Sequence, residues 1–122
     1  MIAVIFEVWP AEGRTQTYFE LAAALRADLE SIDGFISVER FQSLTEPGKL
    51  LSLSFFDNEK AVSAWRDRPS HRAVQAQGRA GVFENYRIRI AGVVRDYGLT
   101  ERGQAPEDSR VAHRTSPRGV SD

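Results

Sequence analysis

The chain has 122 residues, which is room for one domain built around one hydrophobic core. Its 16 basic and 17 acidic side chains leave a net charge of −1, so the sequence lacks the positive field that nucleic-acid binding requires. Cysteine is absent, which excludes disulfides, thiolate nucleophiles and cysteine-bound metals.

The first predicted element is a strand over residues 2–9. Ile2, Val4, Phe6 and Val8 alternate with Ala3, Ile5, Glu7 and Trp9, and two largely apolar faces are typical of a central strand. The apolar run is too short to cross a bilayer and carries no basic segment before it. We therefore expect a cytoplasmic protein that does not bind membranes.

A long amphipathic helix is predicted next. Thr17 and Glu20 have the spacing of a capping box, and Gly34 suits the left-handed position that follows a helix. The apolar positions that recur at helical spacing are Tyr18, Leu21, Ala22, Leu25, Leu29 and Ile32.

Residues 35–43 and 49–56 are predicted to form a hairpin around the Thr45–Gly48 turn. In its second strand Leu51, Leu53 and Phe55 alternate with Leu50, Ser52, Ser54 and Phe56. One face of that strand is therefore mostly large, and the other is partly small and polar.

Two helices and a strand complete the pattern. Asp57 or Asn58 can cap a helix that carries Trp65, and Pro69 is expected to begin a second short helix that ends near Gln77. Residues 83–95 form the last predicted strand, in which Tyr86, Ile88, Ile90 and Val94 alternate with Arg87, Arg89, Ala91, Val93 and Arg95.

The element order β-α-β-β-α-α-β predicts an α+β, ferredoxin-like domain over residues 1–98 with a four-stranded antiparallel sheet in the order 4-1-3-2. Residues 99–122 are polar and are expected to form a flexible tail or one draped over a partner. Helices can cover only one sheet face, and we expect the other to carry Ile5, Trp9 and Phe56. Burial of that face predicts a homodimer.

These features resemble the antibiotic biosynthesis monooxygenase family. The resemblance covers about residues 1–97 and rests on the Gly34-Phe35 step into the hairpin, on Trp65, on Ser70-His71 and on the strand from Phe83 to Val94. It implies a dimeric α/β barrel. Some members oxidise quinols or anthrone-like polyketides with molecular oxygen and no metal or flavin, others degrade haem, and one group isomerises a small phosphorylated sugar derivative.

The resemblance also bears on cofactors. Trp65 matches a tryptophan of the cofactor-free oxygenases, while Ala61 and His71 stand where these enzymes can carry Asn and Tyr. Glu7 and Gln75 fall near the positions where haem degraders carry Asn and the axial His, which argues against haem. His71 and His113 are too far apart in the sequence to build a metal site. We expect no cofactor and no metal.

His71 is the first candidate for catalysis, as a general base that removes a phenolic or enolic proton, and Glu7 is the second. The alternative roles are a locally bonded histidine and a structural ion pair between Glu7 and Arg87 or Arg89. An arginine can also stabilise an oxyanion of the substrate. The candidate substrate-binding residues are Trp65, Trp9, Tyr86, Arg40 and Arg89.

The sequence thus predicts a cofactor-independent monooxygenase that acts on a small aromatic, quinol or polyketide-like substrate. The alternatives are a non-catalytic dimeric protein that binds a small apolar ligand and an isomerase on the same fold.

Overall fold

The computed structural model describes residues 1–113, and the chain divides into two units between Gly92 and Val93. No helix within residues 1–113 is both long and apolar enough to cross a bilayer. The first unit contains β1 (Ile2–Pro10), α1 (Thr15–Glu30), β2 (Phe35–Gln42), β3 (Leu50–Phe56), α2 (Glu59–Arg66), α3 (Pro69–Gln77), the π-helical turn η1 (Gly78–Val82) and β4 (Phe83–Gly92), and the second contains α4 (Glu107–His113).

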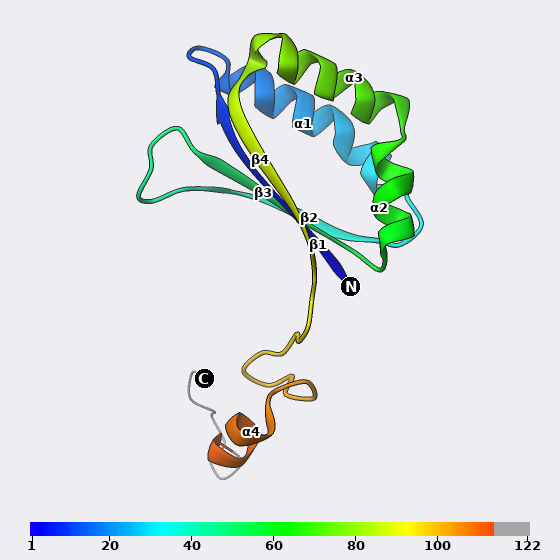
Figure 1. Cartoon of the computed structure of the whole chain (residues 1–122), viewed down its shortest axis with the longest axis vertical. Coiled ribbons are helices and arrows are strands. Elements are labelled where there is room, and N and C mark those ends of the chain that lie inside the picture. Colours follow the sequence, from blue (N-terminus) through cyan, green and yellow to red (C-terminus); the bar gives the residue numbers. More distant parts are fainter. Residues whose placement is uncertain (114–122) are drawn as a thin grey trace. The chain divides into compact units, whose positions relative to one another are not determined.

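The four strands form one sheet in the order β2-β3-β1-β4, and every neighbouring pair is antiparallel. This confirms the predicted ferredoxin-like α+β fold and its strand order. The helices α1, α2 and α3 lie on one side of the sheet (Figure 1). The sheet therefore has a helix-covered face and a free face, and β1 is central, as its two apolar faces predict.

The helix starts show which capping signals are used. Arg14 occupies the N-cap of α1 and makes no side-chain cap, so the predicted capping box of Thr17 and Glu20 does not start this helix. Of the two predicted cap candidates, Asp57 and Asn58, it is Asn58 that caps α2, because its Oδ1 accepts a hydrogen bond of 2.9 Å from the Ala61 N–H.

The segments that follow α2 agree with the prediction at their start and differ at their end. Pro69 is the first residue of α3 and Gln77 the last, but η1 then follows before β4, and β4 ends at Gly92 rather than at Arg95. The second unit contains α4 where only a polar tail was predicted, and acidic side chains in its first turn favour a helix N-terminus. Predictions for residues 114–122 lie outside the described residues.

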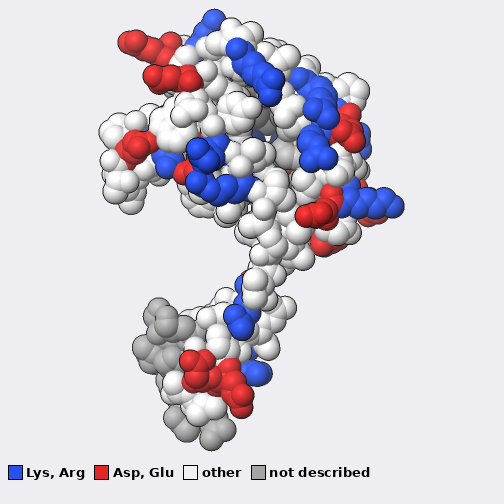
Figure 2. Space-filling model, viewed as in Figure 1, with Lys and Arg blue, Asp and Glu red and all other residues white. Residues whose placement is uncertain are grey.

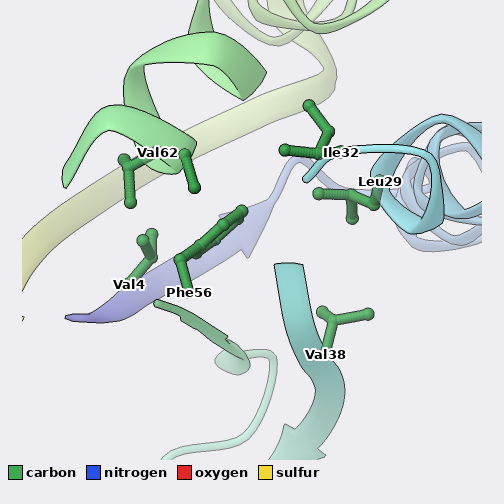
Figure 3. Packing of buried hydrophobic residues seen from close by; sticks show 7 residues of the cluster. Val4, Leu29, Ile32, Val38, Phe56 and Val62 are labelled. Carbon is green, nitrogen blue, oxygen red and sulfur yellow. The ribbon is translucent and has the colours of Figure 1, made fainter. Parts of the chain in front are cut away.

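Phe56 lies in the main core and not on the free face, so its predicted position was wrong. Its register partner on β1 is Ile2, which shares the helix-covered face with Val4. Its side chain is 0% exposed and packs with Leu29 and Val62 (Figure 3). The apolar side chains of β3 on the free face are Leu51, Leu53 and Phe55.

Charged side chains of both signs are interspersed over the visible surface of the first unit (Figure 2). This view shows no extended patch of one sign, in keeping with the net charge of −1.

Candidate active site

A cavity of about 160 Å³ lies between the helix-covered face of the sheet and the three helices of the first unit. Every element of this unit except η1 contributes to its wall. The lining residues are Val4, Phe6, Tyr18, Leu21, Ala22, Leu25, Arg40, Ser52, Ser54, Trp65, His71, Val74, Gln75, Phe83, Tyr86 and Ile88.

Two serines on β3 make room for this cavity. Ser52 and Ser54 lie on the helix-covered face, between the larger Leu50 and Phe56 at the ends of the strand. Because a serine side chain is short, the sheet is left unfilled at its centre while both of its ends pack against helices. The partly small and polar strand face seen in the sequence is thus the floor of the cavity.

Aromatic rings form one wall. Phe83 begins β4, and its ring centroid lies 5.9 Å from that of Phe6 and 5.7 Å from that of Tyr18. Tyr86 lies 5.7 Å from Phe6. Rings at these separations attract each other edge to face or tilted, so the wall is a connected apolar surface.

Gly78 allows Phe83 its position in this wall. A Cβ on Gly78 would lie 2.5 Å from Cε2 of Phe83, although the backbone of Gly78 is ordinary right-handed helix (φ −58°). Gly78→Ala should therefore keep the fold and displace the Phe83 ring, weakening binding of an aromatic ligand by about ten-fold, as for a lost buried ring contact. Titration calorimetry measures this.

Gly92→Ala is the control, because a Cβ there meets nothing within 4 Å. Equal affinities for the Gly78 and Gly92 variants would contradict the importance of this ring position.

Trp65 and His71 meet at the junction of α2 and α3. Their ring centroids are 4.2 Å apart with an interplanar angle of 54°. Trp65 Nε1 and His71 Nδ1 are both buried and have no hydrogen-bond partner within residues 1–113. Burial lowers the pKa of His71, and the nearby Arg72 and Arg66 lower it further. The imidazole is therefore neutral at pH 7 and able to accept a proton.

The chain before His71 is tied to α1 by Asp28. Ser70 Oγ donates a hydrogen bond of 2.5 Å to Asp28 Oδ2, and Arg68 Nη1 forms an ion pair of 3.3 Å with Asp28 Oδ1. These two contacts fix the first turn of α3 beside α1, and with it the position of the imidazole.

Arg40 and Tyr18 supply the other polar groups. Arg40 Nε is buried and has no hydrogen-bond partner in the described part of the chain. Tyr18 is 5% exposed. Burial raises the pKa of Tyr18, while the nearby Arg40 guanidinium lowers it in part. The Tyr18 hydroxyl therefore remains protonated at neutral pH.

The structure brings four of the seven predicted site residues together: His71, Trp65, Tyr86 and Arg40 all line the cavity. The other three, Glu7, Trp9 and Arg89, lie on the free face of the sheet.

Glu7 forms an ion pair of 2.6 Å with Lys49 and a second with Arg89. Its hydrogen bonds with Lys49 and then Arg89 lower the pKa of the Glu7 carboxyl. Lys49 also lies 5.2 Å from the ring centre of Trp9. This free-face cluster matches the structural ion pair that the sequence left as the alternative.

Sequence reasoning missed several cavity residues. Of the two aromatics on β1, Phe6 lines the cavity and Trp9 does not. Ser52 and Ser54 had a signal, since polar residues interrupt an apolar strand, whereas Tyr18 looked like any other position of the apolar helix stripe. Within residues 1–113, no group of three His, Cys, Asp or Glu side chains is placed to hold a metal ion.

Curated proteins with related sequences agree with this architecture. Over 93 residues the chain is 45% identical to jasmonate monooxygenase ABM from Pyricularia oryzae. This aligned segment covers 76% of this chain and 43% of that protein. The chain thus spans less than half the length of that relative. It is also 31% identical to the uncharacterized protein YqjZ of Bacillus subtilis over 93 residues. That aligned segment covers 76% of this chain and 79% of YqjZ.

Solved structures share the fold. Rv0793 from Mycobacterium tuberculosis superposes with a TM-score of 0.71 at 18% identity, over 80% of this chain and 98% of that one. A protein from Deinococcus radiodurans superposes with a TM-score of 0.73 at 13% identity, over 82% of this chain and 99% of that one. At sequence level, the antibiotic biosynthesis monooxygenase family matches residues 1–77. With the two relatives, this match shows that the chain belongs to the antibiotic biosynthesis monooxygenase family.

Proposed function

We propose that the protein is a monooxygenase that oxidises a small aromatic, quinol or polyketide-like molecule with molecular oxygen and without a metal or flavin. One observation carries the proposal: a neutral, half-buried imidazole lies against an indole in an aromatic-walled cavity, and a buried nitrogen of each ring is unpartnered within residues 1–113. Family membership and the monooxygenase named among the relatives support it.

The chemistry follows from the groups in the cavity. His71 accepts a proton from an acidic C–H or O–H of the substrate and leaves a carbanion or enolate. That anion gives one electron to oxygen, and the two radicals combine to form a C–O bond as a peroxide. In an anthrone, loss of the second proton from the same carbon breaks the O–O bond, so a CH₂ group and O₂ become a C=O group and water. In a hydroquinone the proton leaves the hydroxyl first, oxygen adds at a neighbouring ring C–H, and loss of that C–H proton breaks the O–O bond to give a hydroxyquinone and water. The substrate supplies all the electrons.

The remaining cavity residues bind and position the substrate. The Arg40 guanidinium gives the cavity a permanent positive charge that can hold an anionic group of the substrate. The rings of Trp65 and Tyr86 provide flat apolar surface, and the indole also holds the imidazole in place. Glu7, Trp9 and Arg89 take no part in this site, because the sheet separates them from the cavity.

Oxygen uptake tests the proposal. Protein freed of metal by chelation, and showing no flavin absorbance, should consume one O₂ per ketone or quinone formed when it is given anthrone or a hydroquinone. Saturable ligand binding without oxygen uptake would instead favour the non-catalytic binding protein. Conversion of a substrate at an unchanged rate under nitrogen would favour the isomerase.

We also propose that the protein is a homodimer that buries the free faces of two sheets. Ile5, Leu51, Leu53 and Phe55 lie on this face and are only partly buried in one chain, and Phe41 is 42% exposed. Apolar surface of this extent usually marks an interface in a soluble protein.

Light scattering at micromolar concentration should give twice the mass of one chain. Leu53→Lys should give monomers, because it places a charge at the centre of this face, where Leu53 is paired with Ile5. Leu44→Lys is the matched control, since Leu44 is fully exposed in the turn between β2 and β3. A monomeric wild-type protein would overturn this part of the proposal.

A further inference from the structure

Arg40 is a charged residue without a charged partner. It lies on the helix-covered face of β2, opposite Ser52 of β3, and is half-buried beneath the helices. Within residues 1–113 it forms no ion pair with an Asp or Glu, and its Nε has no hydrogen-bond partner. A guanidinium withdrawn from water costs free energy unless an anion or several acceptors compensate for the lost hydration.

The cavity around Arg40 contains no acidic side chain. None of its lining residues is Asp or Glu, and the remaining basic residue is the neutral His71. Arg40 therefore gives the cavity one permanent positive charge, although both signs are interspersed on the surface of the same unit (Figure 2). Electrostatically, the cavity is suited to a ligand that carries one negative charge.

Hydrogen-bond donors stand beside that charge. The Tyr18 hydroxyl lies near the Arg40 guanidinium, and Ser52 and Ser54 line the floor. A guanidinium fork matches the two oxygens of a carboxylate, and a neighbouring hydroxyl can donate to one of them. The rest of the wall is apolar and aromatic, which suits the hydrocarbon part of the same molecule.

We propose that the ligand of this cavity is a small monocarboxylate, with its carboxylate on Arg40 and Tyr18 and its apolar part among Phe6, Phe83 and Trp65. The inference names the substrate class of the site and, for the reaction, rests on the proposed function. The binding itself requires no oxidation. The two can therefore be tested separately.

Trp65 offers a direct readout of binding. The sequence contains two tryptophans, and Trp9 lies on the free face, so Trp9→Phe leaves one tryptophan in the wall of the cavity. In this background, titration with benzoate should change the fluorescence and saturate. Benzamide, its neutral counterpart of the same shape, should bind about ten-fold or more weakly, because charged hydrogen bonds are lost.

Variants at Arg40 assign the effect to its charge. Arg40→Gln should weaken benzoate binding by about ten-fold or more and leave benzamide nearly unchanged, and Arg40→Lys should recover part of the loss. Arg87→Gln removes the same charge from the opposite face of the sheet, and should leave both affinities unchanged. Circular dichroism of each variant checks that it is folded.

The proposal is overturned if the protein with Arg40 intact binds benzoate no better than benzamide, or if it binds neither. It is also overturned if Arg40→Gln leaves the preference for benzoate over benzamide unchanged. Oxygen uptake with a neutral hydroquinone, together with any of these results, would leave the proposed function standing without the carboxylate. Charge-selective binding without oxygen uptake on any of the substrates above would leave the carboxylate site standing without the oxygenase.

Discussion

His71→Ala is expected to lower the rate of substrate oxidation by about two orders of magnitude, which is what a positioned general base usually contributes. The imidazole is the one neutral nitrogen base among the cavity residues, and without it the substrate must ionise into water. The measurement is kcat/KM from oxygen uptake for wild type and variant on the same anthrone-like or quinol substrate.

The pH dependence gives a second readout. The working form is the neutral imidazole, so kcat/KM should rise with pH through the pKa of His71 and level off above it. Burial, Arg72 and Arg66 lower this pKa from its ordinary value of 6.5, so the rise should be centred below that value. The His71→Ala variant should lack this inflection.

Two controls separate catalysis from structure. Added imidazole should restore part of the rate of His71→Ala by occupying the space of the lost ring, and His113→Ala, which removes the other histidine of the chain, should behave as wild type. Equal rates for wild type and His71→Ala would show that His71 is structural. The base would then have to be another cavity residue or the solvent.

Gly34→Ala is expected to lower the stability of the fold by about 3 kcal/mol. Gly34 has a φ of +93°, where a side chain is strained, and a Cβ there would lie 2.9 Å from the Cβ of Ala61. Ala61 is 4% exposed in the core cluster, so α2 would have to move away from the start of β2. Strain and overpacking each cost about 1 to 3 kcal/mol. The thermal midpoint should fall by about 10 °C or more.

Gly48→Ala isolates the strain from the contact. Gly48 also has a positive φ, +82°, but a Cβ there meets nothing within 4 Å. Gly48→Ala should therefore lower the free energy of unfolding by about 1 to 2 kcal/mol only. Thermal unfolding of both variants, followed by circular dichroism, makes the comparison. If the two thermal midpoints agree, the close approach of Gly34 to α2 adds nothing to the loss of stability.

Much of the fold can be read from local signals. The strand alternation, the helix stripe from Tyr18 to Leu29, the Asn58 cap and the proline that begins α3 all act over a few residues. The positive φ of Gly34 is of the same kind. Three local features were missed: η1 and α4 were not predicted, and β4 ends three residues before Arg95.

The chain by itself determined the order of the elements and the pairs of strand faces. Only the tertiary structure decided which strand face the helices cover. Alternation with a period of two separates two faces but does not tell which one is buried. For that reason Phe56 proved to be core, Phe6 rather than Trp9 reached the cavity, and Glu7 and Arg89 paired on the free face. Tyr18 meets Arg40 only because α1 packs over β2, an arrangement set by burial of the whole sheet face and by no local pattern.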